Sequence, residues 1–331
     1  MRTYLGVDGG GSKTRFLLIN ESGQVLGSHT EGPAYHLEIG VEALEAMLAR
    51  GIEHTLQRAS LAPTKLTFAF LGLPAYGEDR ALQSHLDAAP SRALPAGNYR
   101  CGNDMVCGWA GALAGAEGIN IVAGTGSIAY GEYGGCSARA GGWGELFSDE
   151  GSAYWLAREG LRVFSRMSDG RSPHGVLYEL VRRHFALQED LDLCAAIYGK
   201  SLAQRSQLAQ LSRLVAEAAR AGDAAAHALF AQAATELADI VHAVRDRLRV
   251  PHEVHLPLSY SGGIFQLGEL LLVPFEAALT NRTRRYRLLP ARLPPDGGAA
   301  LYAAKLAGTP LPAASIDALE ASLAPRRSGP S

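Results

Sequence analysis

Two short glycine-rich segments carry the residues best suited to binding phosphate. The first, GVDGGGSKT, spans residues 6–14 and differs by one residue from a Walker A loop, because Ser12 stands between Gly11 and Lys13. A Walker A loop must lead into a helix, whose N-terminus completes the anion site. The residues that follow here, RFLLI, are mostly apolar and favour a strand. The segment is therefore interpreted as a hairpin turn between two strands and not as a P-loop.

A hairpin turn of this composition can still hold phosphate. Successive backbone N–H groups in a glycine turn form a concave nest for anions, to which Ser12 adds a hydroxyl and Lys13 a charge. Asp8 would repel phosphate, so its expected role is to hold Mg²⁺, through water because Mg²⁺ keeps several waters. A plain hairpin turn is the alternative for this loop taken alone. The expected nucleotide contacts here are Gly10, Gly11, Ser12 and Lys13.

A second loop of the same kind strengthens the phosphate hypothesis. It also lies between two predicted strands, and two such loops facing each other across a cleft would clamp a triphosphate. Its residues are Gly124, Thr125, Gly126 and Ser127. A third glycine pair, Gly262 and Gly263, follows the apolar segment EVHLPLSYS and opens a predicted helix. Bare backbone at a helix start suits an adenosine or an α-phosphate.

The loops belong to a repeated order of strands and helices. In the first half, strands are predicted at 3–7, 15–20, 25–28, 66–71 and 99–103, and helices at 38–59, 79–88 and 104–114. The order restarts at INIVAGTGSIAYGEYGG and continues with helices at 152–167, 175–185 and 201–248, the last broken at 221–223. A strand at 254–261, a helix at 265–279, a strand at 285–289 and a helix at 295–308 follow. This order predicts a duplicated α/β architecture with a cleft between the halves.

Composition and charge exclude several classes of function. The 331 residues suffice for two domains, and a net charge of −2 without a basic run argues against binding to nucleic acid or anionic lipid. No apolar run approaches the roughly 20 residues that span a bilayer, and no secretion signal is recognised, so a cytoplasmic protein is expected. A homodimer is expected as the commonest oligomer. Reduced, structural thiols are expected for Cys101, Cys107, Cys136 and Cys194, which show no C-x-x-C spacing.

At its three loops the chain resembles the sugar kinase, actin and Hsp70 superfamily. GVDGGGSKT, AGTGS and SGGIF match the phosphate-1, phosphate-2 and adenosine motifs of that superfamily. GGWGELFSDEGSAYW, residues 141–155, resembles the signature of N-acetylglucosamine kinases in the BadF/BadG/BcrA/BcrD ATPase group. The resemblance runs from residue 4 to about residue 308 and implies two ribonuclease H-like, actin-like ATPase domains. They are expected at 1–116 and at 117–308, the second with helical insertions, before a poorly ordered tail at 309–331.

The resemblance also implies roles for single residues. Ser12 and Thr125 would contact ATP phosphate, and Ala209 falls near a nucleotide contact. Asp104 stands at the sugar-binding carboxylate that acts as general base, and a carboxylate at a strand end can accept the proton of an attacking hydroxyl. Its alternative role is a helix cap. The other sugar-site residues implied are Asn103, Gly142, Trp143, Gly144, Asp149 and Glu150.

Three of these sugar-site residues have alternative roles. Asp149 and Glu150 precede a predicted helix and could instead compensate its macrodipole. Trp143 either stacks on a pyranose ring or supports the glycine-rich backbone, and support is favoured. Near Pro33 the family usually carries an Asn that touches the sugar, and here Tyr35 stands at that position. The choice between N-acetylglucosamine and glucosamine therefore stays open.

The function expected is ATP-dependent phosphorylation of the 6-hydroxyl of an amino sugar, first of all N-acetylglucosamine, with glucosamine as the alternative. A less favoured alternative is an ATPase activator of an acyl-CoA dehydratase or reductase that carries an iron–sulfur cluster. Cys101 and Cys107 flank Asp104, but they form no cluster-like run. A sugar-sensing regulator would need a helix-turn-helix segment, which is not recognised. A kinase with a cysteine-rich zinc loop is disfavoured by the scattered cysteines.

Overall fold

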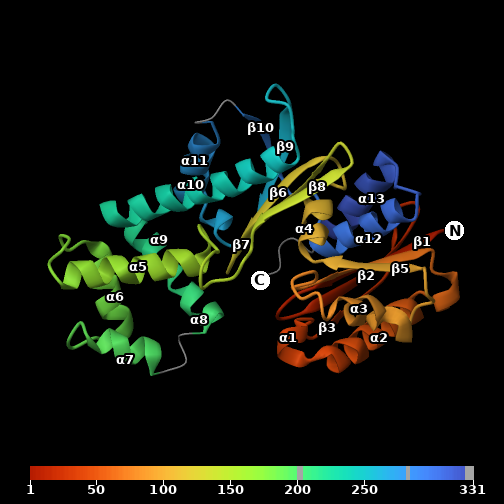
Figure 1. Cartoon of the computed structure of the whole chain (residues 1–331), viewed down its shortest axis with the longest axis horizontal. Coiled ribbons are helices and arrows are strands. Elements are labelled where there is room, and N and C mark those ends of the chain that lie inside the picture. The colour runs from red at the N-terminus through yellow and green to blue at the C-terminus, as the bar shows by residue number, and fades with distance from the viewer. Residues whose placement is uncertain (200–203, 281–283, 325–331) are drawn as a thin grey trace. The chain divides into compact units, whose positions relative to one another are not determined.

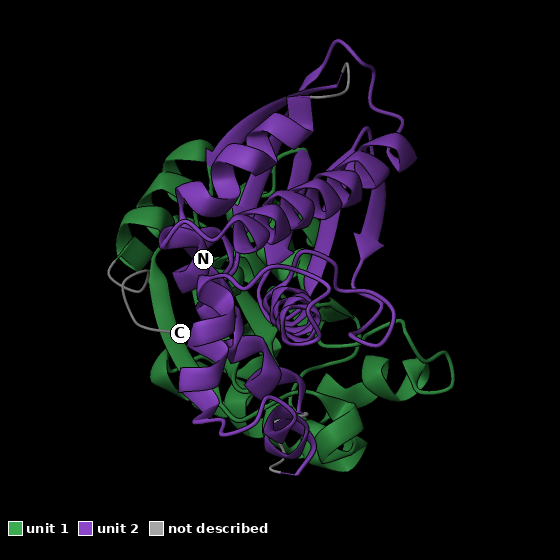
Figure 2. Cartoon of the chain, turned by 90° about the vertical axis from the view of Figure 1, so that its left-hand side faces the viewer, with its two compact units in different colours: residues 1–117, 290–331 green, residues 118–289 purple. Residues whose placement is uncertain are grey.

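The structure is a computed structural model that describes residues 1–199, 204–280 and 284–324. The chain forms two compact units (Figure 2). Unit 1 consists of Met1–Glu117 together with the chain from Pro290 onward, and unit 2 is Gly118–Leu289. None of the helices in the described part of the chain combines the length and apolar character that crossing a membrane requires.

Unit 1 is built on a sheet of five strands in the order β3-β2-β1-β4-β5 (Figure 1). The strands are β1 (Thr3–Gly9), β2 (Thr14–Asn20), β3 (Val25–Glu31), β4 (Phe68–Leu73) and β5 (Tyr99–Asn103). The first three form an antiparallel meander, and β4 and β5 are added in parallel. The helices are α1 (His36–Ile39), α2 (Val41–Arg58), α3 (Gln83–Ala88), α4 (Met105–Ala112), α12 (Pro295–Leu306) and α13 (Ala313–Leu323).

Unit 2 repeats this arrangement. Its strands are β6 (Gly118–Ala123), β7 (Ser127–Tyr133), β8 (Cys136–Gly141), β9 (His255–Ser261) and β10 (Arg285–Pro290), in the order β8-β7-β6-β9-β10. Again three antiparallel strands come first, and β9 joins β6 in parallel. Its helices are α5 (Ala153–Ser168), α6 (Val176–Phe185), α7 (Asp192–Tyr198), α8 (Arg205–Gln210), α9 (Ser212–Arg220), α10 (Ala224–Arg247) and α11 (Glu269–Thr280). The matching strand orders confirm the duplicated α/β architecture.

The alternation of side chains along β1 divides unit 1 into two layers. Leu5 and Val7 point into the apolar core under α2, whereas Gly6 and Asp8 point to the opposite face. That opposite face is covered by α12, whose backbone lies directly against β1. A Cβ on Gly6 would come 2.6 Å from the carbonyl oxygen of Asp296, so only glycine fits there.

A second glycine contact joins α12 to α4. A Cβ on Gly298 would overlap the backbone N of Gly111 and the carbonyl oxygen of Cys107. The two helices lie side by side in Figure 1 and make extensive contact. Because the small-residue face of α12 fits both β1 and α4, the segment 290–308 belongs to unit 1. The sequence pattern had predicted it as part of the second domain.

The segment after 308 also differs from the poorly ordered tail that was predicted. Residues 313–323 form α13, which buries Leu319 and Leu323. Gly23, in the turn between β2 and β3, lies so close to the carbonyl of Ser315 that it has no room for a side chain. Tyr4 Oη and Thr309 Oγ1 are also hydrogen-bonded, at 2.8 Å. Residues 325–331 of the predicted tail lie outside the described residues.

The helical part of unit 2 follows the prediction with finer divisions. The predicted break at 221–223 is confirmed, and Asp223 caps α10 by accepting hydrogen bonds from Ala225 N and Ala226 N. A further division at residue 211 separates α8 from α9, and α7 was not predicted. The first residues of the predicted helix, 201–203, lie outside the described residues.

The contact between α12 and α4 can be tested by adding one methyl group. Gly298→Ala should lower the free energy of unfolding by about 1–3 kcal/mol, because the methyl meets backbone that cannot rotate away. The lower midpoint of urea unfolding, followed by circular dichroism, measures the effect. Gly32→Ala is the control, since a Cβ on Gly32 would meet no atom within 4 Å. Equal midpoints for the two variants would contradict this packing.

Candidate active site

Three aspartates come together on the α12 face of unit 1. Asp8 is near the end of β1, Asp104 directly follows β5, and Asp296 lies in the first turn of α12. Burial raises the pKa of Asp8 well above its ordinary value, and the charges of Asp104 and Asp296 raise it further. Arg15 and Lys13 lower it, but not enough to cancel these effects. The charged form of Asp8 is therefore disfavoured where it stands, by burial first and by its two acidic neighbours second.

Parallel pairing places two of these aspartates at one edge of the sheet. β1 pairs in parallel with β4, and β4 with β5, so the carboxyl ends of all three strands meet. Gly72 on β4 pairs with Asp8 on one side and Gly102 on the other. A Cβ on Gly72 would lie 3.0 Å from the Cα of Asp104, so the missing side chain lets the start of α4 approach.

Asp104 occupies the position before α4 where a capping residue would stand, yet its carboxylate makes no cap hydrogen bond. The side chain of Asn103 caps the start of the helix instead. Its Oδ1 accepts a hydrogen bond from Met105 N at 3.1 Å, and its Nδ2 donates to the carbonyl of Tyr76 at 3.2 Å. Asn103 thus bonds the helix start and the loop after β4, while the carboxylate of Asp104 contributes to the aspartate group.

The first glycine loop is a turn between β1 and β2, as predicted. Gly9 pairs with Thr14 across the hairpin, and the tip between them exposes Ser12 and Lys13. The carbonyl of Gly10 accepts a hydrogen bond from Ala34 N at 2.9 Å, which fixes one side of the loop. Because a strand follows the turn, the predicted difference from a P-loop is confirmed.

The second glycine loop is anchored to the start of α5. The carbonyl of Gly124 accepts a hydrogen bond from Ala153 N at 2.9 Å, and that of Thr125 accepts one from Tyr154 N at 3.3 Å. Ser127 is buried, and its hydroxyl donates to the carbonyl of Glu150 at 2.7 Å. The hydroxyl of Ser127 therefore holds the loop together, whereas Thr125 is exposed at its tip.

The third glycine segment lies against the second one. Ile264 N donates to the carbonyl of Ala123 at 3.1 Å, just before the loop begins. Gly262 has φ +101°, and a Cβ on it would overlap the same carbonyl. Both features follow from the parallel pairing of β6 with β9, which ends the two strands at one edge. Unit 2 thus brings together the second glycine loop, predicted to hold phosphate, and the third segment, predicted to hold adenosine.

The segment that resembles a kinase signature leaves β8 through an irregular turn. Gly141, Gly142 and Gly144 all have positive φ, which glycine adopts without strain. Trp143 is 68% exposed, and the guanidinium of Arg139 lies 5.8 Å from the centre of its ring. Packing of Trp143 beneath the glycine-rich backbone, the role favoured from the sequence, does not fit this exposure.

Asp149 links this segment to the second loop. It is buried and has φ +62°, an unusual conformation for a residue with a side chain. Its Oδ1 accepts a hydrogen bond from Ser127 N at 3.2 Å, and its Oδ2 accepts one from Arg205 Nη2 at 2.5 Å. Burial raises the pKa of Asp149, against the lowering effects of Arg205 and Ser127. Both carboxylate oxygens are thus engaged within unit 2.

The side chains of three further residues of the predicted site lie outside the aspartate group and the glycine-loop contacts described above. Glu150 accepts a hydrogen bond from Ser148 Oγ at 3.1 Å. Ala209 lies in α8, where it is buried. Tyr35 is partly buried at the start of α1. The predicted site residues fall into two groups, one in each unit.

The structure adds two residues that the sequence pattern did not reveal. Asp296 joins the aspartate group from the C-terminal helix, and Arg205 pairs with Asp149. Each is far in sequence from its partners, and neither stands in a recognisable motif. The PDGG segment that opens α12, with an aspartate in the first turn of the helix, is the one sequence feature that points to Asp296.

The two cysteines that flank Asp104 are buried thiols. Burial raises the pKa of Cys101 to about 12, and Asp87 adds to this. Burial also raises the pKa of Cys107 well above its ordinary value, with further contributions from Asp8 and Asp104. Iron–sulfur clusters are held by thiolates, so these environments do not favour a cluster-bearing role.

Comparison with known proteins identifies the family. Residues 5–303 match the BadF/BadG/BcrA/BcrD ATPase family. The chain belongs to this family. The N-acetyl-D-glucosamine kinase of Dictyostelium discoideum is 28% identical over 309 residues, which cover 91% of this chain and 97% of the relative. Glucosamine kinase GspK of Vibrio cholerae is 30% identical over 240 residues, covering 72% of this chain and 78% of the relative.

A solved structure supports the fold of this family member. The crystal structure of a candidate N-acetylglucosamine kinase from Chromobacterium violaceum has a TM-score of 0.69 and 28% sequence identity. It matches over 91% of this chain and 98% of its own. The predicted fold class, with duplicated actin-like ATPase domains, is confirmed.

The pair of Arg205 and Asp149 gives a testable prediction. Arg205→Gln should lower the free energy of unfolding by about 1–3 kcal/mol at neutral pH, because it leaves a buried carboxylate without its charged donor. The loss should shrink as the pH falls through the pKa that Asp149 has in the folded variant, since protonation there removes the unpaired charge. Urea unfolding at several pH values measures both effects.

Arg213→Gln, at an exposed position on α9, is the matched control and should leave stability unchanged. A loss for Arg205→Gln that is no larger than that of Arg213→Gln would show that the ion pair does not stabilise unit 2.

Proposed function

We propose that this chain is an ATP-dependent kinase that phosphorylates the 6-hydroxyl of an amino sugar, with N-acetylglucosamine as the preferred substrate. The observation that carries the proposal is the placement of Asp104. Its carboxylate directly follows β5, the parallel strand at the edge of the sheet, makes no cap bond, and belongs to a group of aspartates on one face of unit 1. Membership of an ATPase family and the similarity to an N-acetyl-D-glucosamine kinase support this reading.

Asp104 is assigned the role of general base. In the transfer, the sugar O6 forms a bond to the γ-phosphorus while the bond from that phosphorus to the β–γ bridging oxygen breaks. ADP leaves with that electron pair, and the O6 proton passes to the carboxylate of Asp104. Asn103 supports this role by taking over the capping of α4.

The nucleotide is assigned to the three glycine segments. In the first loop Ser12 and Lys13 are exposed at the hairpin tip beside Gly10 and Gly11, which suits contact with phosphate oxygens. In the second loop the hydroxyl of Thr125 has the corresponding place. Adenosine is assigned to the backbone at the third segment, Gly262 and Gly263, and Ala209 is kept as a weaker nucleotide contact.

The aspartate group fits Mg²⁺. It offers hard oxygen donors, and the raised pKa of Asp8 reflects its burial first and the repulsion from Asp104 and Asp296 second, both of which a divalent cation would offset. Asp8 and Asp296 are the residues that would hold the ion, through water. When bound, Mg²⁺ supplies charge neutralisation for the β- and γ-phosphates.

The sugar is assigned to Asp104 with Asn103 and to the signature segment with Gly142, Trp143 and Gly144. Asp149 and Glu150 belong to the same segment. Since Asp149 already bonds Arg205 and Ser127 N, it would use its remaining acceptor capacity for a sugar hydroxyl. Glucosamine is the second candidate substrate, because a glucosamine kinase is among the relatives and Tyr35 replaces the usual Asn.

The function is tested by a coupled assay of ADP release across a panel of hexoses and amino sugars. N-acetylglucosamine should stimulate release most, and the product should carry phosphate on O6 by NMR. Highest kcat/KM with glucosamine would transfer the assignment to the alternative substrate. Absence of sugar-stimulated release with every member of the panel would refute the kinase assignment.

The base is tested by Asp104→Asn. The amide cannot accept the proton, so kcat should fall by about 10²–10⁴-fold while ATP binding, measured by calorimetry, stays close to normal. Asp79→Asn, at an exposed position in the same unit, should leave kcat unchanged. Near-normal turnover of Asp104→Asn would remove this residue as the base.

A further inference from the structure

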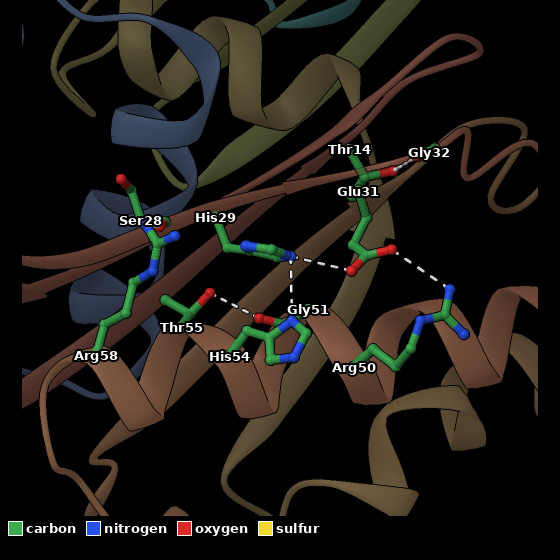
Figure 3. A network of polar contacts seen from close by, with 10 residues as sticks. All are labelled: Thr14, Ser28, His29, Glu31, Gly32, Arg50, Gly51, His54, Thr55 and Arg58. Carbon is green, nitrogen blue, oxygen red and sulfur yellow. Dashed lines mark hydrogen bonds and ion pairs between the residues drawn. The ribbon is translucent and has the colours of Figure 1, made fainter.

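A separate group of metal-ligating side chains lies on the other face of the unit 1 sheet (Figure 3). It consists of His29 and Glu31 on β3 and His54 on α2. His29 Nε2 lies 3.0 Å from Glu31 Oε1 and 3.3 Å from His54 Nδ1. These three ligand atoms all lie within 4.8 Å of one another.

The sheet pleat and two glycines bring the three residues together. His29 pairs with Phe16, which belongs to the core under α2, so His29 and Glu31 face that helix and not the aspartate group. Gly27 lets the helix approach β3, since a Cβ there would come 2.7 Å from a carbonyl oxygen of α2. Gly51 likewise has no room for a side chain over the ring of Phe16.

Hydrogen bonding alone does not satisfy these contacts. His29 Nε2 faces the carboxylate of Glu31 and a ring nitrogen of His54 at once. If His29 Nε2 carries a proton it donates to one of them, and if it does not, its single lone pair accepts from one of them. In either tautomer one close contact has no proper hydrogen bond. A cation between the three atoms would accept a lone pair from each.

We propose that His29, Glu31 and His54 bind one divalent transition-metal ion, with Zn²⁺ preferred. Two imidazole nitrogens and a carboxylate oxygen are ligands that suit Zn²⁺, whereas Mg²⁺ prefers oxygen alone. Bonds of about 2.0–2.1 Å at tetrahedral angles separate neighbouring donor atoms by roughly 3.3 Å. The contacts of 3.0 and 3.3 Å from His29 Nε2 are close to that spacing.

The surroundings hold the ligands in place. Arg50 Nη2 pairs with Oε2 of Glu31 at 3.3 Å, which leaves Oε1 directed at the histidines (Figure 3). Arg58 Nη1 donates to the carbonyl of Ser28 at 2.7 Å and ties β3 to α2 beside the group. His54 is exposed, so an ion can enter from solvent, and water can fill the fourth position.

The ion would act as a clamp beside the first glycine loop. Glu31 pairs with Thr14, the residue at which the turn ends and β2 begins. Thr14 Oγ1 also donates to the carbonyl of Gly32 at 2.8 Å. Fixing β3 on α2 therefore fixes the base of that turn.

The test is a calorimetric titration of the full chain with ZnCl₂ after chelator treatment, without nucleotide or sugar. We expect one site per chain whose affinity falls at least tenfold in His54→Gln. His85→Gln, at an exposed position on α3 in the same unit, should bind as the wild type does. Zn²⁺ should also raise the Tm of the wild type by several degrees and leave that of His54→Gln unchanged. MgCl₂ should give no binding at this site.

A spectroscopic measurement distinguishes this site from binding to thiols. Co²⁺ in place of Zn²⁺ should give the visible bands of nitrogen and oxygen ligation, without the charge-transfer absorption of thiolates such as exposed Cys136 or Cys194. Equal Zn²⁺ affinity of wild type and His54→Gln, or thiolate absorption, would overturn the proposal. Glu31→Gln replaces His54→Gln if the latter has a lower Tm in chelator. Because neither ATP nor sugar is present, failure here leaves the proposed kinase function untouched.

Discussion

The packing of α12 against β1 and α4 is the constraint on which the aspartate group of unit 1 depends. Gly6 and Gly298 remove the side chains that would hold these backbones apart. Only then does Asp296, from the C-terminal part of the chain, come close enough to influence Asp8. A fragment that ended before residue 290 would leave the α12 face of β1 exposed and would lose one of the three carboxylates. The helices α12 and α13 therefore belong to unit 1, which carries the proposed base, and not to unit 2.

The carboxylates of the two units have different charged and hydrogen-bonding neighbours. In unit 1, burial and the charges of Asp104 and Asp296 raise the pKa of Asp8, and Arg15 and Lys13 offset this rise only in part. In unit 2, Asp149 has Arg205 as a direct partner and a backbone N–H as a second one. A paired carboxylate costs less to bury and holds a fixed geometry, which suits the positioning of a loop. Asp149 is thus well placed to orient the second glycine loop.

Local sequence was a good guide to the parts of this structure that depend on neighbouring residues. The hairpin loops, the strand before Asp104 and the duplicated order follow from alternation, apolar runs and glycine positions. The missed features depend on contacts between distant segments. Asp296 and Arg205 gain their roles only through packing, and the Pro-, Ala- and Ser-rich composition after residue 308 concealed the apolar side of α13. The boundary near 290 was missed because the sequence of a helix with a small-residue face does not show which strand or helix it packs against.

The pleat of the unit 1 sheet also separates two kinds of ligand chemistry. On the face that meets α12, Asp8 of β1 lies near Asp104 and Asp296, whereas the face under α2 carries two imidazoles and one carboxylate. Hard and borderline cations prefer these two donor sets respectively, so one sheet can offer sites that do not compete for the same ion. Neighbouring positions on a strand point to opposite faces, and this places Thr14, paired with Glu31, next to Arg15, paired with Asp8. Any coupling between the two faces would therefore pass through the short β1–β2 turn that both pairs flank.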